Sequence, residues 1–373
     1  MPLRQTAEQP QAFGRASSAS PEVQSRCTDL IDELAADGRL AHDGLVALIS
    51  GATEADREYA RGRAAAVAHE HFGNRVFVRG LIEFSNHCRQ DCLYCGIRKS
   101  NREAERYRLD ADQILACCAE GYALGYRTFV LQSGEDAWYT TDLVVDVVSR
   151  IRTAYPDCAI TLSIGERGRD AYQRFHDAGA DRFLLRHETA TSEHFAQLHP
   201  PSQVLATRLR CLRDLKEIGF QTGAGFMVGS PFQTSDHLAA DLELLAELRP
   251  HMVGIGPFLP HRRTPFGDRP AGSVDLTLFL LSLVRLMLPT VLMPATTALG
   301  TARPGAREQG IQAGANVLML NLSPQAQRPK YLLYDNKAVT GEVAENTRAV
   351  QRSLERIGYQ MVVDRGDHPE VAQ

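Results

Sequence analysis

The feature that most constrains the fold is an alternation, between Val76 and Ala326, of short apolar runs with amphipathic helical runs. Repeated about eight times, this alternation is the sequence signature of βα units that build a parallel sheet. The expected strands are residues 76–84, 128–132, 159–164, 182–185, 221–226, 252–255, 291–294 and 316–320. Eight such strands predict an α/β fold, a closed (βα)8 barrel of the TIM type.

Glycines at the ends of the expected helices support this pattern. Gly125, Gly179, Gly219 and Gly314 each precede a small or aromatic residue shortly before a strand. Glycine suits the left-handed residue that closes a helix and turns the chain toward the next strand. The repeat is therefore structural, without detailed sequence similarity between units.

Four regions follow along the chain. Residues 1–20, rich in Gln, Ala, Ser and Pro, are expected to be a disordered tail. Apolar residues at helical spacing predict N-terminal helices over 21–75, the barrel occupies 76–326, and residues 327–373 form a segment that closes it.

Composition narrows the possible partners and location. The 373 residues carry a formal net charge of −4, so no basic excess points to nucleic acid. No apolar run approaches the ~20 residues that span a bilayer, and residues 1–20 lack the pattern of a signal peptide. We therefore expect a cytoplasmic protein with no membrane contact.

Three cysteines lie in a short loop directly after the first expected strand. Cys88, Cys92 and Cys95 are spaced four and three residues apart. Structural zinc usually takes four ligands, often as two separated pairs, and no second pair is present. Three thiolates in one loop suit a [4Fe–4S] cluster with one iron left open to another ligand.

Two alternatives stand beside this prediction. The loop could be a zinc knuckle, with His87 as a further ligand, although its adjacency to Cys88 makes joint ligation awkward. Cys117 and Cys118 are consecutive on an expected helix and point about 100° apart, which disfavours a shared metal. We therefore expect both to be buried small side chains. The same interpretation covers Cys27, Cys158 and Cys211.

The loop and its neighbours resemble the radical S-adenosylmethionine (SAM) superfamily. Tyr94 stands just before the last cysteine, as the superfamily's loop has an aromatic residue there. Further motifs are similar to the HydE family of [FeFe]-hydrogenase maturases, in the biotin synthase-like branch, over residues 76–335. They are Phe-Ser-Asn-x-Cys-Arg-x-x-Cys-Leu-Tyr-Cys-Gly, Leu-Gln-Ser-Gly-Glu-Asp, Leu-Leu-Arg-His-Glu-Thr-Ala, Gly-Ile-Gly-Pro-Phe-x-Pro-His and Pro-Ala-Thr-Thr-Ala-x-Gly.

The resemblance implies an enzyme that cleaves SAM reductively at a [4Fe–4S] cluster to give a 5′-deoxyadenosyl radical. It implies that Cys88, Cys92 and Cys95 ligate the cluster. Residues implied to contact SAM are Tyr94, Gln132, Ser133, Gly134, Glu135, Glu188, Arg208, Met227, Met252, Tyr331 and Leu333. An Arg fork suits the SAM carboxylate.

The implied substrate is a small organometallic iron fragment that carries carbon monoxide, cyanide and cysteine. Cationic and hydroxyl donors near strand ends suit such an anionic ligand: Thr161, Arg182, Arg186, Thr296 and Thr297. Arg182 and Arg186 could instead form ion pairs with Asp181 or Glu188 at the barrel rim. Implied partners are a ferredoxin- or flavodoxin-like reductant and companion hydrogenase maturases.

The sequence departs from some members of the family at its C-terminal end. Val339, Thr347 and Val350 occupy positions where those members carry cysteines for a second cluster, so no second cluster is expected. Two other functions remain open. One is a radical SAM enzyme of the same branch on another substrate, similar to methylornithine synthase or biotin synthase. The other is a non-catalytic iron–sulfur or zinc scaffold.

Overall fold

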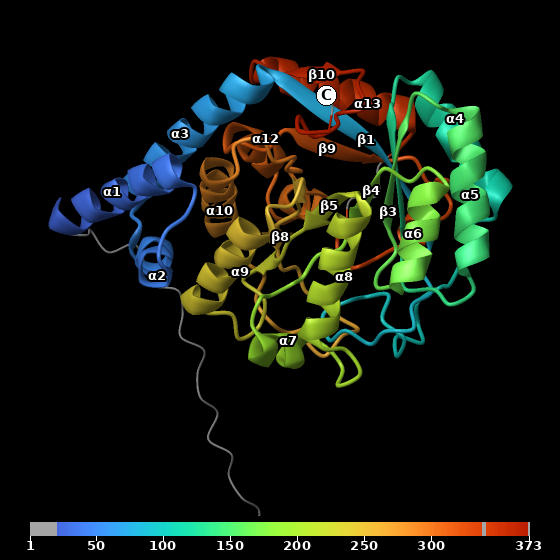
Figure 1. The fold of residues 1–373 in the computed structure, drawn as a ribbon, viewed down its shortest axis with the longest axis horizontal. Helices are drawn as coiled ribbons and strands as arrows, with labels where there is room; N and C mark the ends of the chain where they lie inside the picture. Colours follow the sequence, from blue (N-terminus) through green and yellow to red (C-terminus); the bar gives the residue numbers. More distant parts are fainter. Residues whose placement is uncertain (1–20, 338–340, 372–373) are drawn as a thin grey trace, which may run out of the picture.

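A parallel sheet forms the centre of the protein, and its longest strand is β1 (Arg75–Ser85) (Figure 1). The computed structural model describes residues 21–337 and 341–371. The hydrogen-bonded order is β10-β1-β2-β3-β4-β5-β7, and β9 pairs with the other edge of β1. The remaining bounds are β2 (Thr128–Ser133), β3 (Ala159–Ser163), β4 (Arg182–Leu184), β5 (Gln221–Ala224), β7 (Met252–Val253), β9 (Val317–Asn321) and β10 (Gln360–Val362).

The ring of strands closes between β7 and β9 through residues 291–294. That stretch was predicted as a strand, but it makes single bridges instead of ladders: Leu292 with Met252, and Pro294 with Val317. Five backbone hydrogen bonds also cross this seam, two to residues 251–253 and three to residues 316–317, and the Asn316 side chain accepts another from the Met293 backbone amide at 2.8 Å. The predicted α/β barrel is confirmed.

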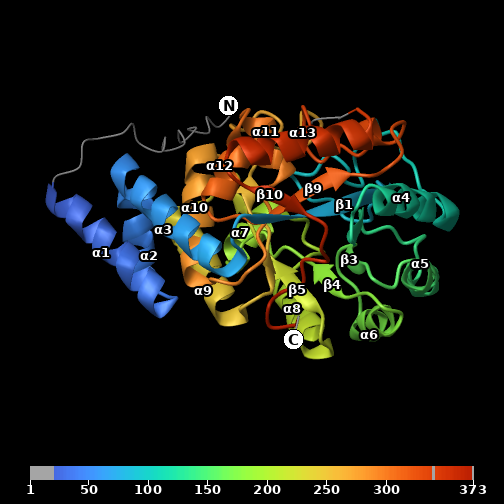
Figure 2. The same cartoon turned by 90° about the horizontal axis from the view of Figure 1, so that it is seen from above.

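Helices surround the strands, as the alternating pattern predicts (Figures 1 and 2). They are α4 (Ala111–Ala123), α5 (Thr141–Ala154), α6 (Arg169–Asp177), α8 (Leu205–Ile218), α9 (Ser235–Leu248), α10 (Val274–Met287), α12 (Ala306–Gln312) and α13 (Val343–Arg356). The glycines expected to close helices, Gly125, Gly179, Gly219 and Gly314, all have positive φ, between 91° and 108°. An added side chain would be strained there.

The loops at the carboxyl ends of the strands contain short elements that sequence periodicity did not predict. They are α7 (Ser192–Leu198), α11 (Thr297–Ala302), the 3₁₀ helix Arg328–Lys330 and a two-stranded pair of β6 (Met227–Val228) and β8 (Gly256–Pro257). Elements this short carry too few residues to show a period. They shape the mouth of the barrel.

The predicted N-terminal helices are α1 (Pro21–Asp37), α2 (His42–Gly51) and α3 (Glu54–Phe72). α3 begins at a capping box between Thr53 and Asp56 and buries Ala60, Ala64 and Ala68, which share one face at four-residue spacing. α1 and α3 pack on α10, and α2 packs on α9 (Figure 2). In the described part of the chain, no helix is long and apolar enough to cross a bilayer.

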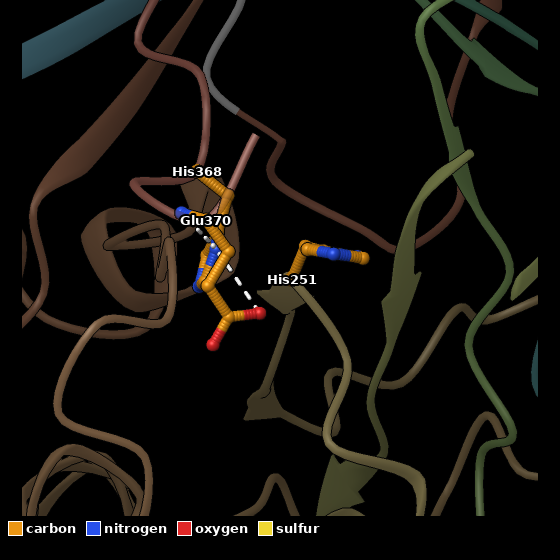
Figure 3. A group of neighbouring side chains, drawn as sticks. All are labelled: His251, His368 and Glu370. Carbon is orange, nitrogen blue, oxygen red and sulfur yellow. Dashed lines mark hydrogen bonds and ion pairs between the residues drawn. The ribbon is translucent and has the colours of Figure 1, made fainter. Parts of the chain in front are cut away.

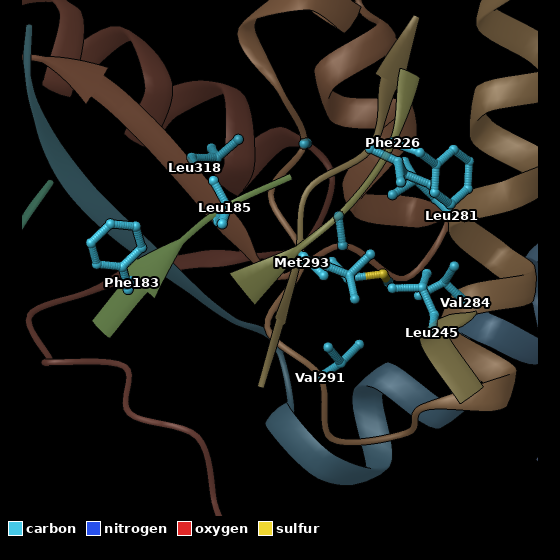
Figure 4. Close-up of a cluster of buried hydrophobic side chains, with 14 of the residues drawn as sticks. Phe183, Leu185, Phe226, Leu245, Leu281, Val284, Val291, Met293 and Leu318 are labelled. Carbon is cyan, nitrogen blue, oxygen red and sulfur yellow. The ribbon is translucent and has the colours of Figure 1, made fainter. Parts of the chain in front are cut away.

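The apolar core fills the space between the strands and the helices around them. Figure 4 shows Phe226 and Met293 near Leu281 and Val284 of α10, with Phe183 of β4 farther away, and all five side chains are buried. The cysteines outside the loop, Cys27, Cys117, Cys118, Cys158 and Cys211, are buried free thiols, as predicted. Burying such side chains stabilises the barrel by about 25 cal/mol per Å² of apolar surface.

The C-terminal segment covers the amino end of the barrel. β10 pairs with the first residues of β1, and the following residues reach under β2 to β5. Asp367 accepts hydrogen bonds from Arg182 (2.6 Å) and from Gln221 Nε2 (2.7 Å), and Arg365 pairs with Asp181 (2.9 Å). The residues that follow α13 therefore lie against this end of the barrel.

The positions compared with second-cluster cysteines lie in or near α13. Thr347 donates to the Val343 carbonyl oxygen at 2.8 Å and contacts the Tyr126 hydroxyl, while Val350 packs on the core. Val339 and the predicted tail 1–20 lie outside the described residues.

Candidate active site

The cysteine loop leaves the carboxyl end of β1 and is shaped by two polar side chains. The Arg106 guanidinium donates to the carbonyl oxygens of Ile97 (2.8 Å), Arg98 (2.7 Å) and Asn101 (3.1 Å). The Asn101 amide donates to the Gly96 carbonyl oxygen at 2.6 Å. Arg106 thus orders a loop that has no ladder of its own.

Asn86 fixes the start of the loop. Its side-chain amide donates to the carbonyl oxygens of Glu105 (2.8 Å) and Lys330 (2.7 Å), and its oxygen accepts from the Tyr107 amide (2.8 Å). Asn86 is fully buried, so these bonds satisfy a polar group that would otherwise be costly to bury. The Asn of the Phe-Ser-Asn motif therefore has a structural role.

The three thiols are free, half-buried and close enough to influence one another. Burial raises the pKa values of Cys88 and Cys92 above that of a free thiol. It raises the pKa of Cys95 to about 12. The neighbouring sulfurs raise the pKa of Cys92 further. Three adjacent thiolates in such a place need a bound cation, and a metal cluster supplies that charge.

The Ser133–Glu135 stretch packs directly against this loop. The Gly134 amide donates to the Ser85 carbonyl oxygen at 3.1 Å, and a Cβ at Gly134 would lie 2.3 Å from the His87 carbonyl oxygen. The Arg89 amide donates to the Glu135 carbonyl oxygen at 2.9 Å. Only glycine allows so close an approach, so the two strand-end segments form one unit.

The Glu135 carboxylate is already occupied by protein groups. One oxygen accepts from Arg89 Nε (3.0 Å) and Gln90 Nε2 (2.7 Å), and the other accepts from the Glu166 amide (3.0 Å). Ser133 Oγ donates to the Gly134 carbonyl oxygen at 2.7 Å, and Gln132 donates to the Tyr331 hydroxyl at 3.3 Å. The structure thus brings the whole stretch from Gln132 to Glu135 to the cysteine loop.

A buried charge network lies beside the loop and is joined to Glu135 through the Glu166 amide. Arg208 donates to Glu166 Oε1 (2.5 Å) and to the Arg186 carbonyl oxygen (2.7 Å), while Arg186 binds Glu188 through two hydrogen bonds (3.1 and 2.7 Å). Burial alone would raise the pKa of Glu188, but Arg186 and Arg208 lower it below its usual value. The alternative of an Arg186–Glu188 ion pair is confirmed.

Residues 331–337 cross the mouth as a strap. The Gly96 amide donates to the Leu333 carbonyl oxygen at 2.9 Å, and the buried Tyr331 lies beside Lys337, whose ammonium is 4.9 Å from its ring centroid. Lys337 also pairs with the fully buried Glu83 near the end of β1. Tyr331 and Leu333 therefore do lie against the cysteine loop.

A second brace comes from residues 198–203, between α7 and α8. The Leu93 amide donates to the Leu198 carbonyl oxygen (2.9 Å), the Tyr94 hydroxyl lies 3.2 Å from His199 Nε2, and Cys92 Sγ lies 3.3 Å from Gln203 Oε1. Met227 packs in the same cluster as Leu93 and Tyr94. Tyr94 and Met227 are thus placed together beside the loop.

Two predicted residues lie elsewhere. Met252 packs with Phe72 and Phe77 at the amino end of the barrel, and its sulfur accepts from Arg79 at 3.0 Å. Arg182 begins β4, is fully buried, and donates to Asp367 and to the Arg365 carbonyl oxygen. The expectation that both line the mouth is corrected, because each is the first residue of its strand.

The threonines occupy the barrel interior and its rim. Thr161 lies within β3, and Thr296 precedes α11, whose first residue is Thr297. Among the described residues, the hydroxyls of Thr161 and Thr296 are buried and have no hydrogen-bond partner. Buried unpartnered hydroxyls are costly, so both fit a ligand that would bond to them.

Several residues that shape the site were not singled out from the sequence: Asn86, Arg106, Glu166, His199, Gln203 and Lys337. Their partners lie 15 or more residues away or bind through backbone carbonyl groups, which no local period reveals. The one available signal was the Asn of the Phe-Ser-Asn motif.

Another group of possible metal ligands gathers at the amino end of the barrel, where Figure 3 shows His251, His368 and Glu370. However, Nδ1 of His251 accepts from the Thr222 amide (3.1 Å), and Nδ1 of His368 accepts from the Glu370 amide (3.3 Å). Both neutral rings therefore carry their proton on Nε2. Metal-bound histidines instead donate from their second nitrogen, so this group does not match a metal site.

Comparison with known proteins agrees with this geometry. Residues 82–245 match the model of the radical SAM superfamily. The chain is 45% identical over 271 residues to the [FeFe] hydrogenase maturase subunit HydE of Thermotoga maritima. The aligned region covers 73% of this chain and 77% of that relative. The chain belongs to the radical SAM superfamily. It is a radical SAM enzyme, and its resemblance to HydE is confirmed.

Similarity also extends to the methylornithine synthases, as one sequence and one crystal structure show. The chain is 26% identical over 324 residues to 3-methylornithine synthase of Methanosarcina acetivorans, covering 86% of this chain and 89% of that one. The crystal structure of methylornithine synthase (PylB) superposes with a TM-score of 0.79 at 26% identity, over 89% of this chain and 97% of that one. Membership in this superfamily implies a [4Fe–4S] cluster and SAM.

Proposed function

We propose that this radical SAM enzyme processes a small organometallic iron fragment carrying carbon monoxide, cyanide and cysteine, in assembly of the [FeFe]-hydrogenase H-cluster. The observation that carries the proposal is the 45% identity to a HydE maturase over most of both chains. The site is compatible with it, since buried donors face the barrel interior beyond the cysteine loop.

Cys88, Cys92 and Cys95 would hold the [4Fe–4S] cluster. When bound, that cluster supplies the electron that cleaves SAM to a 5′-deoxyadenosyl radical. The loop fits such a group because its thiols are adjacent and half-buried, while Arg106 and Asn101 hold the backbone between them. With three protein ligands, one iron remains for SAM.

The residues around the loop would bind and orient SAM. Gly134 lets the Ser133–Glu135 stretch pack against the cysteine loop, where this stretch would meet the methionyl group of SAM. Arg208 would hold the SAM carboxylate with the donors not used by Glu166 and Arg186. Glu188, Tyr94 and Met227 would contact the nucleoside. Tyr331 and Leu333, on the strap, would exclude water.

The substrate would lie deeper in the barrel. Thr296 and Thr161 present unpartnered hydroxyls, and Thr297 and Arg186 stand near the same rim. These donors suit an anion with carboxylate and cyanide groups. Arg182 is left out, because its guanidinium is engaged at the amino end.

A second candidate is a reaction similar to that of the 3-methylornithine synthases. Similarity over 86% of the chain and the TM-score of 0.79 favour it. Electron delivery by a ferredoxin- or flavodoxin-like protein and contact with companion maturases are further proposals that follow from the HydE resemblance.

Anaerobic reconstitution with iron and sulfide tests the enzyme. We expect about four irons per chain and formation of 5′-deoxyadenosine from SAM with a chemical reductant. Cys92→Ala should lose both. Cys117→Ala, which removes a buried thiol on α4, should retain both.

The substrate is tested by adding a synthetic iron–carbonyl–cyanide–cysteine complex or a mixture of free amino acids to the loaded enzyme. Faster 5′-deoxyadenosine formation with the iron complex supports the maturase proposal. Faster formation with the amino acids alone, with 3-methylornithine among the products, would replace it by the second candidate. Zinc in place of iron, or iron without SAM cleavage, would leave only a scaffold.

A further inference from the structure

The brace formed by residues 198–203 touches the cysteine loop at three successive residues. The Leu198 carbonyl oxygen accepts a hydrogen bond from the Leu93 amide, and His199 Nε2 accepts one from the Tyr94 hydroxyl. Gln203 Oε1 lies 3.3 Å from Cys92 Sγ. Gln203 is 6% exposed, so its amide is held in place by packing. Its backbone amide donates to the Pro200 carbonyl oxygen at 2.9 Å, which fixes the turn that presents it.

We propose that Gln203 is a positioning residue that donates an amide hydrogen bond to the Cys92 sulfur and thereby raises the reduction potential of the cluster. The inference rests on the proposed role of Cys92 as a cluster ligand. It concerns a residue outside the cysteine motif and outside the predicted SAM contacts.

The direction of the hydrogen bond between Cys92 and Gln203 reverses when Cys92 becomes a ligand. As a thiol, Cys92 donates to the Gln203 side-chain oxygen. A ligating thiolate has no proton and only accepts. A half-turn of the terminal amide exchanges its oxygen and nitrogen in nearly the same positions, so Nε2 then faces the sulfur at the same separation.

His199, the other buried polar side chain of the brace, does not offer this hydrogen bond. His199 Nδ1 lies 3.0 Å from the Phe195 carbonyl oxygen, so that nitrogen carries the proton. His199 Nε2 is then the acceptor for the Tyr94 hydroxyl. Within the brace, Gln203 is therefore the side chain placed to donate to Cys92.

A hydrogen bond to a cluster sulfur stabilises the reduced state, which carries one more negative charge. Donation from Gln203 therefore makes it easier for the cluster to accept the electron that SAM cleavage requires. Losing it should make the midpoint potential more negative without removing a ligand.

The test is a redox titration of the reconstituted protein without SAM, followed by electron paramagnetic resonance of the reduced cluster. Gln203→Met keeps the length of the side chain but cannot donate, and Gln203→Glu keeps its shape but adds a charge that repels the sulfur. We expect midpoint potentials in the order unmodified, then Gln203→Met, then Gln203→Glu, from highest to lowest. Ser202→Ala, an exposed neighbour, should match the unmodified protein.

The midpoint describes only the loaded fraction, so incomplete loading of a variant does not obscure the comparison. Equal midpoints in the Met and Glu variants and the unmodified protein would overturn the role of Gln203. Failure of the unmodified protein to assemble any [4Fe–4S] cluster would instead overturn the proposed function.

Discussion

Buried charges at single residues decide how the mouth of the barrel is built. Arg208 is 6% exposed and bonds to Glu166 and to the Arg186 carbonyl oxygen, so its guanidinium is fixed before any ligand arrives. Arg186 is fixed in the same way by Glu188. Such preorganisation lowers the cost of ordering side chains when a ligand binds.

We predict that Arg208→Lys weakens SAM binding. Lysine keeps the charge but loses the fork that serves Glu166, the Arg186 carbonyl oxygen and a carboxylate together. Loss of a charged hydrogen bond costs about 1.5–3 kcal/mol, which is roughly a 10- to 100-fold higher Kd. Equilibrium binding of SAM to iron-loaded protein measures this. Arg213→Lys, on the exposed face of α8, is the control, and an unchanged Kd for Arg208→Lys would remove Arg208 from the SAM site.

At the scale of elements, the C-terminal segment acts as a polar plug for the amino end of the barrel. It supplies Asp367 to the fully buried Arg182 and Arg365 to Asp181. Burial alone would raise the pKa of Asp367, but Arg182 and Arg365 lower it well below its usual value. The ionised form of Asp367 therefore stabilises the fold.

We predict that Asp367→Asn lowers the free energy of unfolding by about 3 kcal/mol at pH 7, because Arg182 is left buried without its carboxylate. A carboxyl with a depressed folded pKa stabilises the fold above its unfolded pKa, which is about 3.9. The difference in Tm between variant and unmodified protein should therefore shrink as the pH falls below about 4. Thermal unfolding across pH measures it. Glu370→Gln, an exposed neighbour, should show no such difference, and a pH-independent gap would contradict the prediction.

Elements with a clear period were predictable from the sequence, and those held by long-range polar bonds were not. β1 to β5 and the helix-closing glycines follow from apolar runs and from the conformational freedom of glycine. The cysteines of the site follow from their spacing. Gln203, Arg106 and Lys337 depend on partners that only the fold brings near. Arg182 and Met252 were misplaced because they begin their strands, and strand bounds set which end of the barrel a side chain serves.

For the whole molecule, the barrel is uneven around its circumference. β1 forms ladders with β2, β9 and β10, whereas residues 291–294 close the ring through bridges at Leu292 and Pro294. Residues 291–295 make two backbone hydrogen bonds to residues 251–253 and three to residues 316–317, and so short a pairing opens more readily than a ladder of five residue pairs.

We therefore predict faster amide hydrogen exchange at residues 291–295 and 316–318 than at 80–85 and 128–133. Asn316→Ala, which removes the side-chain acceptor of the Met293 amide, should accelerate exchange at the seam and leave β1 and β2 unchanged. Mass spectrometry of peptides from these regions provides the measurement. Equal protection around the ring would contradict the prediction.

The pairing of β1 with β9 and β10 also sets an order of events during synthesis. The first strand and the cysteines that follow it leave the ribosome early, yet β1 receives one edge from β9 and part of the other from β10, near the end of the chain. At about 5–20 residues per second, β1 waits between about 15 and 60 s for β10. The thiols are consequently made long before the cavity that shelters them.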